Sequence, residues 1–341
     1  MMFKNGIPKI IAEAGINHNG DIKNAFKLID VAEKSGADFV KFQTFIPNNL
    51  STNYATTVTY QKNRTKENYQ KSLLEKNNLK FSDFKKLYNY TKKKSIKILS
   101  SPFDNESLEF LLSLKLEYIK IPSGEITNYF LLKTLSENKS KVILSTGMSS
   151  YKEISVALNL LISKKINLDD IIILHCISNY PTKNKDVNLQ NMVYLKNKFR
   201  TQVGFSDHTV GSKAAEIAVA LGANFIEKHI TLDKRMKGPD HKISLNPIQF
   251  NLFVKKLQNT RVLLGSKQRV LTVLENENKL KSRKSLVAKK IIKKNDIFSF
   301  KNLTAKRPGT GISPMKIKNI IGKKSKSEYK KDQLISSNEE K

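Results

Sequence analysis

The sequence predicts a (β/α)8 barrel followed by a small, mostly β domain. Eight short apolar segments with strand character alternate with helix-patterned stretches over about 260 residues, which is the pattern of this barrel. Polar residues follow nearly every apolar segment, as they do where parallel strands end at an active site. The regular alternation then stops, and shorter segments follow. A doubly wound parallel sheet is the alternative architecture.

Strands and helices are expected to alternate without interruption through the barrel. The predicted strands cover residues 8–14, 37–44, 96–100, 117–122, 141–145, 171–176, 202–205 and 224–230. The predicted helices cover residues 21–34, 83–94, 107–114, 129–137, 151–164, 189–199, 212–221 and 247–264. The first helix shows the reasoning: Ala25, Leu28, Ile29 and Ala32 fall on one face, and Gly36 supplies a C-terminal stop.

One connection is much longer than a barrel requires. About 36 residues, rich in Asn, Thr, Tyr and Gln, separate Thr44 from Phe81. A loop of this length next to an active site is typical of a functional lid, and a disordered insertion is the alternative.

The chain is expected to divide into three parts. A catalytic barrel covers residues 1–264, a linker covers residues 265–282, and the small domain covers residues 283–341. The linker is predicted from the loss of periodicity, and the small domain from short alternating segments and turn signals. We expect the last six residues, 336–341, to be disordered.

Composition narrows the class of protein. The 341 residues carry a net charge of +31, but the lysines are spread over every predicted helix and arginines number only seven. This indicates a solvated basic surface that favours an anionic substrate, and not a nucleic-acid site. Cys176 is the single cysteine, no run of about 18 apolar residues exists, and residues 1–9 lack a signal-peptide core. A cytoplasmic location is therefore expected.

Two histidines at adjacent strand ends predict a metal site. His208 and His229 each follow an apolar segment, and neighbouring strands lie about 5 Å apart. With Glu13 or Asp240 nearby, they would offer Mn²⁺, Mg²⁺ or Zn²⁺ a site with open water positions. By the two-residue period of a strand, Glu227 and His229 point to the same side.

The other strand ends predict a pocket for an anion and a polyol. Lys41, Lys120 and Lys228 would bind a carboxylate or phosphate, while Glu13, Glu125 and Glu227 would hold sugar hydroxyls or move protons. Further polar residues at these ends are Asn17, His18, Gln43, Ser100, Ser101, Ser123, Ser145, Thr146, His175 and Ser178. For His175 and Cys176 a structural role is the simpler interpretation, and for His18 the alternative to a site role is that it shapes a turn.

Ten motifs in order resemble the sialic acid synthases over nearly the whole chain. They are IAEAGINHNG, VKFQTF, SSPFD, KIPSGE, ILSTGM, LHCISNYPT, GFSDHT, EKHITLD, GPDHK and KRPGTGISP. The resemblance implies an enzyme that condenses phosphoenolpyruvate with an N-acetylated amino sugar. It also implies a C-terminal antifreeze-like (SAF) domain and a homodimer in which that domain covers the partner's active site.

The resemblance also implies roles for individual residues. His208 and His229 would bind Mn²⁺ or Mg²⁺, and Arg307 would reach across the dimer to the sugar's N-acetyl group. Phosphoenolpyruvate would be held by Lys41, Ser101, Lys120, Ser123, Ser145 and Ser206. The metal and sugar would be surrounded by Glu13, Gln43, Glu125, Tyr180, Glu227 and Asp240. Ser178 stands where some synthases have asparagine, which bears on the identity of the sugar.

The predicted reaction is that of an N-acetylneuraminate synthase acting on N-acetylmannosamine. The alternative is a legionaminate synthase acting on a 2,4-diacetamido-2,4,6-trideoxyhexose. Two less favoured hypotheses are a Schiff-base pyruvate aldolase using Lys120 or Lys228 and a non-catalytic carbohydrate-binding protein.

Overall fold

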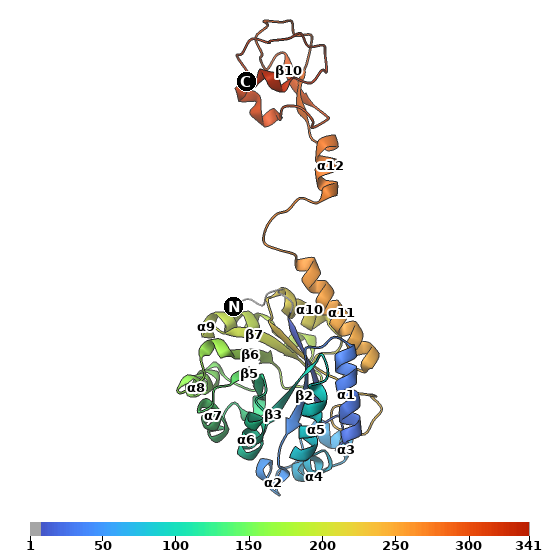
Figure 1. Ribbon diagram of the computed structural model, residues 1–341, viewed down its shortest axis with the longest axis vertical. Coiled ribbons are helices and arrows are strands. Elements are labelled where there is room, and N and C mark those ends of the chain that lie inside the picture. The colour runs from blue at the N-terminus through green and yellow to red at the C-terminus, as the bar shows by residue number, and fades with distance from the viewer. Residues whose placement is uncertain (1–7, 341) are drawn as a thin grey trace. The chain divides into compact units, whose positions relative to one another are not determined.

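The computed structural model describes residues 8–340, and the chain forms two compact units, Met1–Gly265 and Ser266–Lys341 (Figure 1). Residues 1–7, on which the prediction of no signal-peptide core partly rests, lie outside the described part. No helix within residues 8–340 is long and apolar enough to cross a membrane.

The first unit contains an eight-stranded parallel sheet closed into a barrel. Its hydrogen-bonded order is β3-β2-β1-β8-β7-β6-β5-β4, and β3 lies next to β4, so the sheet returns on itself. This sequential order confirms the predicted barrel and excludes a doubly wound sheet. The strands are β1 (Lys9–Gly15), β2 (Phe39–Thr44), β3 (Lys97–Pro102), β4 (Tyr118–Ile121), β5 (Lys141–Ser145), β6 (Ile171–Cys176), β7 (Gln202–Asp207) and β8 (Phe225–His229).

Eight helices, each following a strand of the barrel, correspond to the predicted helices. Apolar residues on their inner faces pack against the outward-facing side chains of the strands. Local sequence signals begin several of them: α8 and α11 start with capping boxes built from Ser150 with Glu153 and from Asn246 with Gln249. The helices are α1 (Ile22–Lys34), α5 (Phe81–Thr91), α6 (Asn105–Ser113), α7 (Tyr129–Ser136), α8 (Tyr151–Ile162), α9 (Gln190–Phe199), α10 (Lys213–Ala220) and α11 (Pro247–Leu264).

A separate apolar cluster fills the inside of the barrel. Alternate residues of the strands point inward. At position 204 the inward-facing residue must be glycine, since an added Cβ would lie 2.4 Å from the Phe225 carbonyl oxygen. The cluster consists of Ile11, Phe39, Leu99, Tyr118, Ile143, Ile172, Leu174 and Phe225.

The long connection between β2 and α5 is ordered. It contains the short helices α2 (Pro47–Leu50), α3 (Thr59–Thr65) and α4 (Gln70–Lys76), which gather at one end of the barrel (Figure 1). An isolated bridge between Thr56 and Tyr69 closes the segment on itself. Leu73 is buried, and the Asn77 side chain donates a hydrogen bond to its carbonyl oxygen. The alternative of a disordered insertion is therefore wrong.

The second unit begins with a helix and continues as a small β fold. Helix α12 (Val273–Ser282) occupies part of the segment predicted as a linker, because Thr272 and Glu275 form a capping box. Strands β9 (Ser285–Ala288) and β10 (Leu303–Lys306) are antiparallel, and isolated bridges extend the pairing. A core of its own supports the unit, with Leu286, Ile292, Phe298, Ile320 and Tyr329 among its members.

The predicted disorder at the C-terminus is wrong for residues 336–340. Residues Ser337–Glu339 form a 3-10 helix, and the Tyr329 hydroxyl donates a hydrogen bond of 2.8 Å to the buried Glu339 carboxylate. Polar composition suggested disorder, but one carboxylate with a partner in the domain core is enough to hold the segment.

Candidate functional site

A cavity of about 440 Å³ opens at the carboxyl ends of the barrel strands. Its floor continues the inward-facing alternation of the barrel core, because each floor residue comes two positions after an inward-facing core residue or another floor residue. The floor residues are Glu13, Lys41, Gln43, Ser101, Lys120, Ser145, Cys176, Ser206, His208, Glu227 and His229. Loop residues around them are Ser123, Glu125, Ser178, Tyr180 and Asp240.

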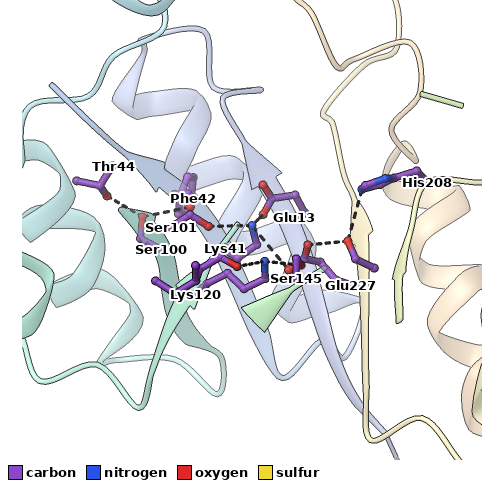
Figure 2. Close-up of polar contacts among 12 residues, drawn as sticks. Glu13, Lys41, Phe42, Thr44, Ser100, Ser101, Lys120, Ser145, His208 and Glu227 are labelled. Atoms are coloured by element: carbon purple, nitrogen blue, oxygen red, sulfur yellow. Dashed lines mark hydrogen bonds and ion pairs between the residues drawn. The ribbon is translucent and has the colours of Figure 1, made fainter. Parts of the chain in front are cut away.

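A buried lysine joins two carboxylates at the centre of this floor. The Lys41 ammonium lies 2.7 Å from Glu13 Oε2 and 3.7 Å from Glu227 Oε2 (Figure 2). The three residues come from β2, β1 and β8, which are neighbours in the barrel. All three side chains are almost fully buried, so each charge depends on the others for compensation.

A second lysine completes the charged floor. The Lys120 ammonium donates hydrogen bonds to the Ser145 hydroxyl at 2.7 Å and to the Ile121 carbonyl (Figure 2). Burial lowers the pKa of Lys120, and the charge of Lys41 lowers it further. A bound anion would reverse this effect, since it would stabilise the ammonium form.

The two carboxylates beside Lys41 differ in charge state. Burial raises the pKa of Glu13 to about 7, although Lys41 opposes the shift. Burial also acts on Glu227, but Lys120, Lys41 and the Ser206 hydroxyl outweigh it and lower that pKa to about 2. Glu13 can therefore gain and lose a proton near neutral pH while Glu227 stays ionised, which is the separation that acid–base chemistry requires.

The two predicted metal ligands lie side by side on the same floor. The ring centroids of His208 and His229 are 5.5 Å apart, and the Tyr180 ring lies 4.1 Å from that of His208. The Nδ1 atom of His208 is 2.7 Å from the Ile177 carbonyl oxygen, so it carries the proton, and Nε2 lies 3.4 Å from the Ser206 hydroxyl. Burial, followed by the charge of His208, lowers the pKa of His229 well below the usual range.

These residues suit a divalent cation in chemistry, although they form only part of a coordination shell. No group of three or more His, Cys, Asp or Glu side chains within residues 8–340 converges as a ready-made metal site. However, buried acceptor atoms without a hydrogen bond gather here: His229 Nδ1, Glu227 Oε2 and Asp240 Oδ1. Imidazole nitrogens and carboxylate oxygens are a donor set for Mn²⁺ or Mg²⁺ acting with substrate and water ligands.

Two loops on the β4 to β6 side bring hydroxyl groups to the cavity. The Ser123 hydroxyl accepts a hydrogen bond from the Gly147 amide, and a Cβ at Gly147 would lie 2.2 Å from the Ser178 Oγ. Glycine at position 147 therefore lets both serines reach the cavity. Glu125 is held by the Asn128 amide at 2.7 Å, and burial raises its pKa.

A buried polar cluster supports the opposite wall. Asn17 donates hydrogen bonds to the Ile230 carbonyl and the Ser244 hydroxyl, and Ser244 donates to the Asp240 carbonyl. The loop after β1 is thereby tied to the loop that carries Asp240. Burial raises the pKa of Asp240 to about 6, opposed by Arg64 and His208.

His18 and His241 take structural roles in that cluster. The Gly20 amide donates to His18 Nδ1, so His18 shapes the turn, as one of the two hypotheses held. His241 lies between the Thr231 hydroxyl and the Asn19 side chain. Burial is the main cause that lowers the pKa of each histidine to about 4, so both are neutral at physiological pH.

Lys228 was predicted at the mouth of the barrel, and this is wrong. Its side chain points outward, opposite to Glu227 and His229, and its ammonium contacts Asp207 Oδ2 at 2.9 Å and the Thr209 carbonyl at 2.6 Å. The two-residue period required this, since position 228 alternates with its neighbours. The pair holds the turn that carries His208, and Lys228 is not available as a Schiff-base nucleophile.

Two other residues also lie away from the cavity lining. His175 contacts the Val187 carbonyl and Asn191, which agrees with a structural role. Arg307 belongs to the second unit, where its Nε donates to the Ser282 carbonyl oxygen. Its predicted contact with a sugar therefore stays a prediction.

The side chains that the long connection contributes to the site were not predicted from the sequence. Six of its residues line the cavity: Leu50, Val58, Gln61, Gln70, Leu73 and Leu74. Arg64 of α3 donates a hydrogen bond of 2.7 Å to the Pro239 carbonyl, beside Asp240. The length of the connection was the only signal, because short irregular helices have no periodicity to reveal their inner face.

Comparison with known proteins places this site in a family. The model of the NeuB family matches residues 28–269, and the model of the SAF domain matches residues 283–338. The chain belongs to the NeuB family. It is 46% identical to an N,N'-diacetyllegionaminic acid synthase of Campylobacter jejuni over 96% of this chain and 98% of the relative. A synthase of the same name from Legionella pneumophila is 39% identical, with 92% and 89% covered.

A solved structure of similar fold supports the assignment. The N-acetylneuraminic acid synthetase of Leptospira borgpetersenii matches with a TM-score of 0.69 and 33% identity, over 82% of this chain and 94% of that one. Membership of the NeuB family makes this chain an enzyme that condenses phosphoenolpyruvate with a second substrate. The hypothesis of a non-catalytic binding protein is thereby rejected.

Acid should destabilise the barrel through His18. Its pKa is about 4 in the folded chain against 6.5 for an ordinary histidine. The unfolded chain therefore binds more protons between these values, and stability is lost as the pH falls from about 6.5. At about pH 5 we expect His18 to cost about 2 kcal/mol of unfolding free energy relative to neutral pH.

Urea unfolding followed by circular dichroism at both pH values measures this loss. The His18→Gln variant, which cannot titrate, should show a smaller loss than the wild type. An equal loss in both proteins would contradict the assignment.

Proposed function

We propose that this NeuB-family enzyme condenses phosphoenolpyruvate with a 2,4-diacetamido-2,4,6-trideoxyhexose to give N,N'-diacetyllegionaminic acid and phosphate. The observation that carries the proposal is 46% identity to a synthase of that name, sustained over 96% of the chain. The relative named for N-acetylneuraminic acid is 33% identical. The comparisons thus favour the alternative over the N-acetylmannosamine reaction that the sequence analysis put first.

Lys41 and Lys120 would bind the phosphate and carboxylate groups of phosphoenolpyruvate. Because Glu13 has a pKa of about 7, the two ammonium groups face only one fully ionised carboxylate, Glu227. The floor therefore has positive charge available for an anion in a site with little water. The hydroxyls of Ser101, Ser123, Ser145 and Ser206 would donate further hydrogen bonds.

The sugar would occupy the side of the cavity formed by β7 and β8. Glu125, Ser178, Tyr180, Asp240 and Gln43 line the same cavity and would surround the sugar. In the reaction, C3 of phosphoenolpyruvate bonds to the aldehyde carbon and water adds to C2. The C2–O bond to phosphate then breaks. Glu13 can supply and accept a proton during these steps, whereas Glu227 holds the charge of Lys41 in place.

A divalent cation, Mn²⁺ or Mg²⁺, would be held by His208 and His229. When bound, it would polarise the aldehyde as a Lewis acid. The hydrogen bond from His208 Nδ1 to the Ile177 carbonyl orients that ring with Nε2 towards the cavity. Such a bond fixes the tautomer that a ligand needs.

Loss of the histidines should abolish turnover but leave the fold intact. We expect His208→Ala, His229→Ala or treatment with EDTA to lower kcat at least 10³-fold, with Mn²⁺ restoring only the EDTA-treated wild type. Phosphate release measures activity, and circular dichroism checks the fold. Full turnover by rigorously metal-free protein would contradict the metal's role.

The active enzyme would be a homodimer in which the SAF domain of one chain covers the barrel of the other. Support comes from the SAF-domain match and from the exposed Arg307 side chain, which the motif KRPGTGISP places in the second unit. Arg307 would contact the sugar's acetamido group in the partner's site.

Mixing two inactive variants tests this arrangement. Chains with Arg307→Ala and chains with His208→Ala should each be inactive, because each variant spoils every site of its own homodimer. A heterodimer would contain one intact site, so random co-assembly should restore about one quarter of the wild-type activity. If Arg307 acts within its own chain, the mixture stays inactive.

Product analysis tests the reaction itself. The enzyme is incubated with phosphoenolpyruvate and either the trideoxyhexose or N-acetylmannosamine, and the acids formed are identified by mass spectrometry. We expect kcat/KM to be at least tenfold higher for the trideoxyhexose, since buried methyl groups discriminate by about that factor. The reverse preference would contradict the proposal. Borohydride trapping of pyruvate on Lys120 would instead support the Schiff-base aldolase.

A further inference from the structure

The cavity has two chemically different halves. Among the residues whose side chains the structure describes, every ionisable side chain that lines it comes from a barrel strand end or from a loop after strands β4 to β8. The segment between β2 and α5 contributes four aliphatic side chains, Leu50, Val58, Leu73 and Leu74, and two amides, Gln61 and Gln70. Residues 45–80 therefore present an uncharged wall to a cavity with a charged floor.

This wall is held in place by contacts at both ends. Arg64 ties α3 to the Pro239 carbonyl, next to Asp240, and the buried Leu73 anchors α4. The Thr57 amide also donates to the Asn68 carbonyl, which keeps the two short helices together. Val58 lines the cavity and is 47% exposed, so its side chain is not fully covered by the rest of the chain.

An aliphatic wall beside amide groups suits a ligand that carries both apolar groups and hydrogen-bonding amide groups. Contact between an apolar cavity surface and a methyl group of the ligand makes binding more favourable. Covering a ligand hydroxyl that then has no hydrogen-bond partner makes binding less favourable. In the proposed reaction, the aldehyde carbon lies at the floor, near His208 and His229. The far end of the sugar chain then extends from the floor towards the wall.

We infer that residues 45–80 form the specificity wall of the sugar site, with Val58 and Leu74 contacting the C6 methyl and C4 acetamido groups of the trideoxyhexose. The inference rests on the proposed function. N-acetylmannosamine differs at these two positions, since it carries a hydroxyl at C4 and a hydroxymethyl group at C5. The wall selects against it because those hydroxyls would meet aliphatic side chains.

Near-isosteric polar substitutions test the wall. Val58→Thr replaces one methyl by a hydroxyl, and Leu74→Asn replaces the branched end by an amide of similar shape. Each variant should lower kcat/KM for the trideoxyhexose roughly tenfold and leave that for N-acetylmannosamine unchanged or higher. The KM for phosphoenolpyruvate should not change. Val156→Thr, at a 60% exposed position on α8 outside the cavity lining, is the matched control and should alter none of these values.

Each outcome has a separate meaning. A shift in the ratio of the two kcat/KM values supports the wall. An unchanged ratio of the two kcat/KM values in Val58→Thr overturns the specificity wall, even when the wild type makes the expected product. Misfolding does not explain such a result, because Val58 is an exposed residue. No turnover of either sugar by the wild type overturns the proposed function, and the inference with it.

Discussion

The site depends on the position of one ammonium group, that of Lys41, between the carboxylates of Glu13 and Glu227. The three residues come from adjacent strands, so barrel closure is what brings them together. Burying any of these charges alone would cost several kcal/mol, and their mutual attraction offsets that cost. The two carboxyl pKa values nevertheless differ: burial raises that of Glu13 to about 7, whereas Lys120, Lys41 and the Ser206 hydroxyl lower that of Glu227 to about 2. The surroundings of the ion pair thereby prepare acid–base chemistry.

The barrel positions this network by continuing its own packing. Phe39 and Ile11 fill the interior, and Lys41 and Glu13 follow them two residues later on the same faces. The inward-facing side chains are therefore apolar in the barrel interior and charged at the carboxyl ends of the strands. The outward-facing side chains differ: Lys228, one residue from Glu227, pairs with Asp207 behind the site. That pair supports the turn at His208 without entering the cavity.

The segment between β2 and α5 adds aliphatic side chains to the cavity from outside the barrel strands. The carboxyl ends of the barrel strands lie close together, so the charged side chains that they carry converge in a small area. A substrate longer than phosphoenolpyruvate needs contacts farther from that floor. Helices α3 and α4 stand there and add aliphatic and amide groups. Family membership rests on similarity along most of the chain, whereas the preference among amino sugars would depend on this outer wall.

The strand and helix order, and most floor residues, follow from the sequence, because a period of two residues in strands and of 3.6 in helices is a local property. The two-residue period placed Glu227 and His229 on the same side of their strand. The same period places Lys228 on the opposite side, so the prediction of Lys228 at the mouth of the barrel was inconsistent with it. The inner face of residues 45–80 had no such period, so only the folded chain reveals that Leu74 and Val58 line the cavity. The pKa values of Glu13 and Glu227 likewise depend on distances to Lys41 and Lys120 that exist only once distant strands meet, since burial and charge act through space and not along the chain.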